Sequence, residues 1–149
     1  MHQKLISTEL TPIARNSIFF STPEQRIYEI MIKIFSDQLV LPNAALHTII
    51  DYKELQRVVS ADEFRFYLQT HVDFCIVDKK TYRPIIGFEL DSSFHDTPQV
   101  IEKDRRKNLF FRLAKIPLVR LRNPDGLSDS EIESELFTAV QNAGVGKVS

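Results

Sequence analysis

Residues 71–91, with the sequence HVDFCIVDKKTYRPIIGFELD, decide the fold of this chain. Segments 71–78 and 84–91 are rich in Val, Ile and Phe, residues that favour β-strands. Between them, residues 79–83 are mostly polar and have the character of a turn. We therefore predict two antiparallel strands joined as a β-hairpin.

Three carboxylates lie on the predicted hairpin. Because side chains alternate along a strand, Glu89 and Asp91 share one face, and Asp73 lies on a face with apolar neighbours. Buried carboxylates lose hydration unless a cation, hydrogen-bond donors or a proton compensates them. A divalent ion such as Mg²⁺ would neutralise such a cluster, and Gly87 would leave space beside it. Alternatively, Glu89 and Asp91 reach solvent and Asp73 has a backbone or basic partner.

Helix signals occur on both sides of the hairpin. A threonine followed by a proline, a common helix start, occurs at positions 22–23 and again at positions 97–98. Apolar residues at helical spacing extend the first helix to about residue 38 and the second to about residue 114. Residues 128–142 combine an acidic first turn with apolar spacing, which predicts a last helix.

The remaining segments complete the predicted order of elements. Residues 39–46 are apolar but contain Pro42, which suits an edge strand or an extended connection. We expect one or two short helices over residues 47–69, a strand over 117–122 and a turn over 123–126. A hairpin combined with a strand-helix-strand crossover predicts an α/β fold with a mixed β-sheet flanked by helices.

Chain length and composition indicate one domain. The 149 residues suit one hydrophobic core, which we place over residues 21–149, after an N-terminal arm of residues 1–20 that packs on the body or contacts a protein partner or missing domain. Cys75 is the single cysteine and the four histidines are scattered, which excludes a disulfide framework and a cysteine-based zinc site. We expect a cytoplasmic protein without a signal peptide or membrane span, because no apolar run is long enough.

Charge is unevenly distributed along the chain, although the net charge is only −1. Residues 103–122 contain eight Lys or Arg and one acid, whereas residues 123–146 contain five acids and no base. A local basic surface is therefore expected, with Lys103, Arg105 and Arg106 as candidate contacts to nucleic-acid phosphates. The alternative is that these residues form the solvated face of a helix.

Several short motifs occur in the order found in a known nuclease superfamily. They are HVDF at 71–74, ELD at 89–91, His95, the helical pair Asp104 and Lys107, and IPLVR at 116–120. Over about residues 20–122 the chain resembles the PD-(D/E)XK nucleases, and within them an uncharacterised bacterial family similar to very-short-patch-repair endonucleases. The resemblance implies a restriction-endonuclease-like mixed β-sheet core flanked by helices and hydrolysis of DNA with Mg²⁺ or Mn²⁺, in repair or defence.

The resemblance also implies roles for single residues. Asp73 matches the signature aspartate and Glu89 matches the second acid, so both would hold the metal ion together with Asp91. Glu24 would supply the glutamate of the first helix. A carboxylate in the first turn of a helix is also favoured by the helix dipole, so Glu24 has a structural explanation of similar weight.

One position departs from the superfamily pattern. Two residues after Glu89, where a lysine is usual, the chain has Asp91, as in the repair-endonuclease branch, where a histidine assists the chemistry. His95 would therefore orient or deprotonate the attacking water. Lys107 is the competing assistant, because helical spacing places it on one face with Asp104, which would fix His95 or an arginine. The departure also leaves open a catalytically inactive module that binds nucleic acid or protein.

Overall fold

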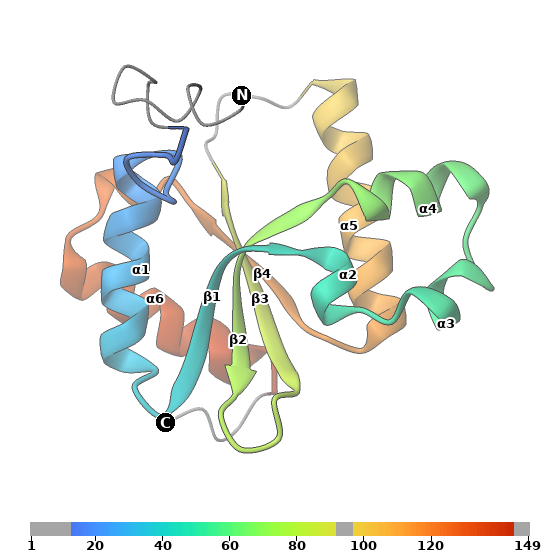
Figure 1. Cartoon of the computed structure of the whole chain (residues 1–149). Coiled ribbons are helices and arrows are strands. Elements are labelled where there is room, and N and C mark those ends of the chain that lie inside the picture. The colour runs from blue at the N-terminus through green and yellow to red at the C-terminus, as the bar shows by residue number, and fades with distance from the viewer. Residues whose placement is uncertain (1–12, 92–96, 145–149) are drawn as a thin grey trace, which may run out of the picture.

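The computed structural model describes residues 13–91 and 97–144, which form a four-stranded β-sheet with helices on both faces (Figure 1). The strands, in their order across the sheet, are β1 (Gln38–Ala45), β2 (His71–Asp78), β3 (Pro84–Asp91) and β4 (Leu118–Arg122). The helices are α1 (Thr22–Ile34), α2 (Leu46–Ile49), α3 (Tyr52–Gln56), α4 (Ala61–Leu68), α5 (Pro98–Ala114), α6 (Asp129–Asn142) and the short 3-10 helix η2 (Pro124–Gly126). The predicted α/β class is confirmed.

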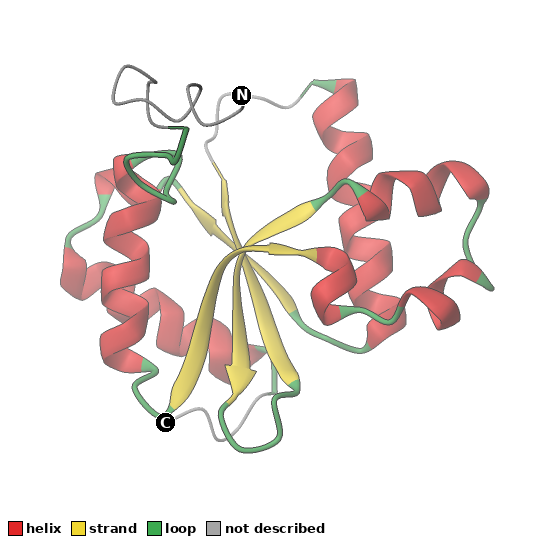
Figure 2. Cartoon of the chain, viewed as in Figure 1, coloured by secondary structure: helices red, strands yellow, loops and turns green. Residues whose placement is uncertain are grey.

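The sheet is mixed, as predicted. Strands β1, β2 and β3 pair antiparallel, and β4 pairs parallel with β3. Helix α5 lies between β3 and β4 in the chain and supplies the crossover that a parallel pair requires (Figure 2). None of the helices in the described ranges is long and apolar enough to cross a membrane.

Each face of the sheet has its own hydrophobic cluster. One cluster joins the sheet to α1 and α6 and includes Ile27, Met31, Phe74, Phe88 and Leu136. The other joins the opposite face to helices α2 to α5 and includes Leu46, Tyr67, Cys75, Phe110 and Phe111. Figure 1 shows these two groups of helices on opposite sides of the strands. The sheet is therefore a central layer that both groups cover.

Helix α1 differs from the prediction at both ends. Ser21 rather than Thr22 is the N-cap, and its Oγ accepts a hydrogen bond from the backbone of Glu24 at 3.3 Å. The helix ends at residue 34 instead of 38, because the buried Phe35 packs against Phe88 and the chain enters β1 at Gln38. Tertiary packing here shortens a helix that apolar spacing alone extends.

The segment after β1 contains three short helices rather than one or two. Asp51 caps α3 by accepting hydrogen bonds from two backbone amides. Ser60 and Glu63 form a reciprocal capping box at the start of α4. Because α3 and α4 each begin at a side-chain cap of their own, the segment divides into separate short helices instead of one continuous helix.

Strand β1 has the predicted edge character. It contains Pro42, and among the described residues it pairs with β2 alone. The next residue, Asn43, has a positive φ of 48°, and its side chain donates a hydrogen bond to the carbonyl of Ile18 at 3.2 Å. This contact fastens part of the predicted arm to the sheet, whereas residues 1–12 lie outside the described ranges.

Candidate functional site

Two of the predicted carboxylates continue the pairing of β2 and β3 where the strand ladder stops. The paired residues extend to Phe74 and Phe88. Beyond them, the backbone N–H of Asp73 donates to Oε2 of Glu89 at 2.9 Å, and the N–H of Leu90 donates to Oδ2 of Asp73 at 2.8 Å. Each acid is thus held by the backbone of the opposite strand, so Asp73 does have the backbone partner that was the alternative to a metal.

Glu89 also contacts a lysine from helix α5. Its Oε1 accepts a hydrogen bond from Nζ of Lys107 in a buried ion pair, and Glu89 as a whole is only 7% exposed. Burial raises the pKa of Glu89 to about 7; the charge of Lys107 opposes this rise, and the charge of Asp73 adds to it. Glu89 therefore takes up a proton more readily than an ordinary glutamate.

Helix α5 presents the predicted face to the sheet. Its N-cap is Thr97, whose side chain accepts a hydrogen bond from Val100 N. Further along the helix, Lys107 forms an ion pair with Glu89 of β3. Asp104 forms an ion pair with Arg120 of β4, with 3.5 Å between Oδ1 of Asp104 and Nη2 of Arg120. The arginine that Asp104 was expected to fix is therefore Arg120.

Arg120 is a site residue that sequence reasoning missed. It lies opposite Glu89 in the parallel register of β3 and β4, and its Nη1 donates to Oδ1 of Asn108 at 2.6 Å. Burial raises the pKa of Asp91, and among the charges the positive charge of Arg120 is the largest that lowers it. We call Glu89, Asp91, Asp104, Lys107 and Arg120 the charged layer, because ion pairs or electrostatic interactions link these residues of α5, β3 and β4.

Gly87 was predicted to leave space beside the acids, and this prediction is wrong. A Cβ added at Gly87 would lie 2.7 Å from Cε2 of Phe111 and 3.3 Å from Cδ1 of Leu118. The absent side chain thus makes room for the apolar end of α5. The glycine allows helix and sheet to approach closely at Phe111.

A pocket of about 660 Å³ lies at the ends of β2 and β3. The start of α1 and helix η2 also line it. Its acidic lining residues are Glu24, Asp73, Asp91 and Asp125, and we call it the acidic pocket. The structure therefore brings together three acids that the sequence indicated and adds Asp125, whereas Glu89 is absent from the described lining and faces Lys107.

The wall of the acidic pocket is fastened by Arg26. Its Nε donates to Asp129 at 2.9 Å, its Nη1 to the carbonyl of Pro124 at 3.3 Å, and its Nη2 to the carbonyl of Leu127 at 2.6 Å. These contacts join α1, which carries Glu24, to the segment that follows β4. Position in the sequence gave no indication of this contact, because its partners lie about a hundred residues away.

The chemistry of these acids suits a hard divalent cation, but their arrangement does not by itself form a metal site. Asp73, Asp91 and Glu24 offer the oxygen ligands that Mg²⁺ prefers, whereas both oxygens of Glu89 already accept hydrogen bonds. In the part of the chain that the structure describes, no group of three or more His, Cys, Asp or Glu side chains is placed to hold a metal ion. The predicted metal site stays a prediction.

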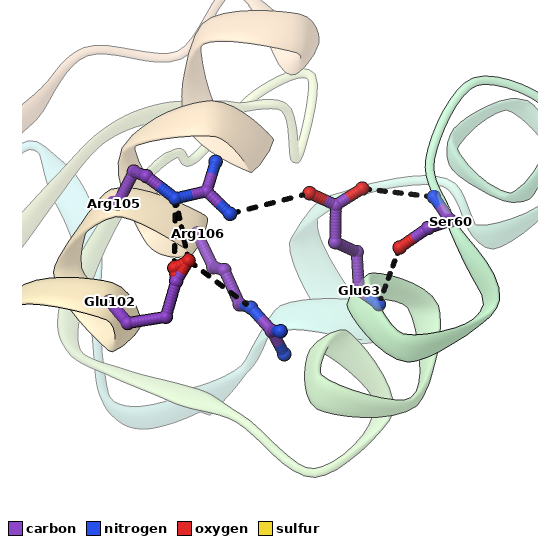
Figure 3. A network of polar contacts seen from close by, with 5 residues as sticks. All are labelled: Ser60, Glu63, Glu102, Arg105 and Arg106. Carbon is purple, nitrogen blue, oxygen red and sulfur yellow. Dashed lines mark hydrogen bonds and ion pairs between the residues drawn. The ribbon is translucent and has the colours of Figure 1, made fainter. Parts of the chain in front are cut away.

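The basic residues predicted to contact nucleic acid differ in their surroundings. Lys103 is exposed. Arg105 donates to Glu102 at 2.7 Å and lies 3.6 Å from Glu63 of α4, as Figure 3 shows. Arg106 places its guanidinium 5.5 Å from the ring centroid of Phe66. A phosphate would compete with these partners for Arg105 and Arg106, but not for Lys103. His95, the first candidate for proton transfer, lies outside the described residues.

The chain matches a known protein family over most of its length. Residues 16–140 match the family model described as Protein of unknown function (DUF2726), and the chain belongs to this family. No curated protein and no solved structure matches the chain. The matched range begins near Phe19 and includes every strand of the sheet and all the residues of the charged layer.

Proposed function

We propose that this domain is a metal-dependent nuclease with a restriction-endonuclease-like fold, related to the PD-(D/E)XK superfamily, and that it hydrolyses DNA phosphodiester bonds in repair or defence. One observation carries the proposal: Lys107 reaches Glu89 from helix α5. Asp91 occupies the usual lysine position, but the charge of a lysine is nevertheless present beside Glu89, with Asp73 on the neighbouring strand. A buried glutamate paired with a lysine and adjoining a second acid, next to an open pocket, is typical of active sites.

In this proposal Asp73, Glu89 and Asp91 hold Mg²⁺ or Mn²⁺, and Glu24 lines the acidic pocket together with Asp73 and Asp91. A bound ion would polarise a phosphoryl oxygen and lower the pKa of a water molecule. Lys107 would favour the ionised form of Glu89, against the effect of burial, and offset negative charge at the phosphate. His95 stays the proposed residue that orients or deprotonates the attacking water.

The pKa of Glu89 gives the proposal a pH dependence. Because this pKa is about 7, the carboxylate form that binds a cation becomes dominant only above neutrality. We therefore expect the affinity for Mg²⁺, measured by calorimetry without substrate, to rise as the pH increases from 6 to 8. A Glu89→Gln variant would show weaker binding and a flatter pH profile. Equal affinity for the two proteins at all pH values would remove Glu89 from the metal site.

The activity itself is tested with purified protein, Mg²⁺ or Mn²⁺, and single-stranded, duplex, nicked and branched DNA. We expect cleavage of at least one substrate and its loss in Asp73→Asn and Glu89→Gln. Glu135→Gln, which changes an exposed acid on α6, is the matched control and should cleave normally. No cleavage of any substrate, or unchanged cleavage in the first two variants, would overturn the proposal.

A catalytically inactive binding module is the second candidate. It is favoured by the engagement of Glu89 with Lys107 and the backbone of Asp73, which explains both acids without a metal. Such a module would bind nucleic acid with strong salt dependence and cleave nothing. With either function, we propose that the protein is cytoplasmic and that residues 1–20 contact another protein. Cell fractionation would test the location, and co-purification would test the contact.

A further inference from the structure

An exposed phenylalanine stands beside the acidic pocket. The side chain of Phe20 is 67% exposed, and the next residue, Ser21, lines the pocket. A single exposed apolar residue is common on protein surfaces and needs no function. Phe20 differs because its position relative to the pocket is fixed by several contacts.

Three contacts fix the segment that carries Phe20. The ring of Phe19 packs inward against Tyr28, with 5.1 Å between ring centroids. The carbonyl of Ile18 accepts a hydrogen bond from Asn43 on β1 at 3.2 Å, and the N–H of Phe20 donates to Oε2 of Glu24 at 3.3 Å. Phe19 is thus the inward anchor, and Phe20 is held outward next to a glutamate of the pocket wall.

Phe20 also has a cationic partner. The guanidinium carbon of Arg15 lies 4.0 Å from the centroid of the Phe20 ring, and Nε of Arg15 donates to the carbonyl of Ser17 at 3.1 Å. The ring stays largely exposed although Arg15 lies over it. An aromatic ring and an arginine together offer a stacking surface and a positive charge, the combination with which proteins bind single-stranded nucleic acids.

We propose that Phe20 and Arg15 form a platform on which one unpaired nucleobase of the substrate stacks, while its backbone continues toward the acidic pocket. The inference rests on the proposed function and narrows its substrate to nucleic acid with single-stranded character: a free strand, an overhang or a flap. A base within an intact duplex has both faces covered by its neighbours and cannot stack on Phe20. The positive charge of Arg15 favours a phosphate beside a pocket whose charged lining residues are all acids.

The test measures binding by the full chain, without divalent ions, to a single-stranded oligonucleotide and to its blunt duplex. A 2-aminopurine base in the single strand reports stacking through loss of its fluorescence. We expect tighter binding of the single strand, with quenching. Phe20→Ala should weaken this binding roughly tenfold and abolish the quenching, whereas Phe20→Trp should retain both.

Two controls separate stacking from general damage. Phe137→Ala removes another exposed phenylalanine, 47% exposed on α6, and should bind like the parent protein. Arg15→Gln should weaken binding and make it less dependent on salt, because one phosphate contact is lost. Circular dichroism of all variants checks that the fold is retained.

The outcomes distinguish this inference from the nuclease proposal. If Phe20→Ala loses binding and quenching but no substrate is cleaved, the platform stands and the nuclease proposal fails. If Asp73→Asn abolishes cleavage but Phe20→Ala binds and cleaves single strands like the parent, the platform is overturned. A parent dimer that Phe20→Ala converts to a monomer would also overturn it, because a second copy of the chain would then cover the ring.

Discussion

The two halves of helix α5 meet the same sheet in opposite ways. The second half buries Phe111 against the sheet, with Gly87 making room, and Phe110 beside it against Phe66 and Tyr67 of α4; both are at most 1% exposed. The first half places Asp104 and Lys107 against the sheet, where they meet charged partners instead of apolar ones. Both halves are partly or fully buried, but only one of them benefits from the hydrophobic effect.

The charged first half of α5 is not the arrangement that would give the fold its highest stability. Buried ion pairs usually contribute little to net stability, because desolvation offsets their attraction, and apolar residues of similar volume often serve equally well. A helix that could have continued its apolar face toward its N-terminus has charges there instead. We therefore expect the apolar half to determine the stability of the fold and the charged layer to determine its chemistry.

The largest expected effect is in the apolar half. Phe111→Ala leaves a cavity against Gly87 and should lower the free energy of unfolding by about 4 kcal/mol. Urea unfolding followed by circular dichroism measures this loss, and Phe137→Ala, at an exposed position, should change little. A loss below about 1 kcal/mol would mean that this contact does not hold α5 to the sheet.

The next effect concerns Lys107. Lys107→Met leaves Glu89 buried without its cation and should cost about 3 kcal/mol at pH 8 and clearly less at pH 5.5, where Glu89 takes up a proton. Adding Glu89→Gln should recover most of the loss. Lys103→Met, on the exposed face of the same helix, is the control. An equal loss at both pH values would show that packing of the lysine, and not its charge, is what matters.

A smaller effect is the pH dependence of the unmodified chain. The pKa of Glu89 is about 7 in the folded state against 4.5 for an ordinary glutamate, so folding favours the protonated form. The resulting stabilisation is complete below pH 4.5 and is lost as the pH rises through 7. Relative to Glu89→Gln, the free energy of unfolding should fall by about 2 kcal/mol between pH 5.5 and 7.5. Parallel curves for the two proteins would contradict this pKa.

The smallest effect is expected at the outer surface of α5. Arg105 is 56% exposed, and its ion pairs with Glu102 and Glu63 are screened by water, so Arg105→Gln should leave the thermal unfolding midpoint almost unchanged. The same variant tests the predicted phosphate contact. Weaker DNA binding at unchanged stability would assign Arg105 to the nucleic-acid surface, and unchanged binding would leave it as a link between α4 and α5.

The fold was largely predictable because its signals are local. The hairpin follows from two runs of β-forming residues, and α5 follows from the pair Thr97 and Pro98, whose capping role the structure confirms. The errors lie where tertiary contacts override local signals, as at Phe35. They also lie where a local signal was overlooked: Ser60 and Glu63 have the spacing of a capping box, which marks a separate helix.

The site was less predictable because distant segments build it. Alternation along the strands and helical spacing placed Lys107 and Asp104 toward the sheet, and both meet it. The hydrogen bond from Leu90 N–H to the carboxylate of Asp73 depends on how two strands separate, and Arg120 joins the site through the crossover between β3 and β4. Neither contact leaves a pattern in a single sequence, because the residues that it brings together are far apart along the chain.

The partners of Arg26 determine when the acidic pocket can be completed during protein synthesis. The pocket wall that it holds, Pro124 to Asp129, leaves the ribosome about a hundred residues after α1. Until then, Glu24 and Asp73 have no opposite wall, although the hairpin that contains Asp73 is already complete. The pocket wall at η2 is therefore synthesised after all four strands of the sheet. A ligand of the pocket would meet a finished binding site only after residues 123–129 have been synthesised.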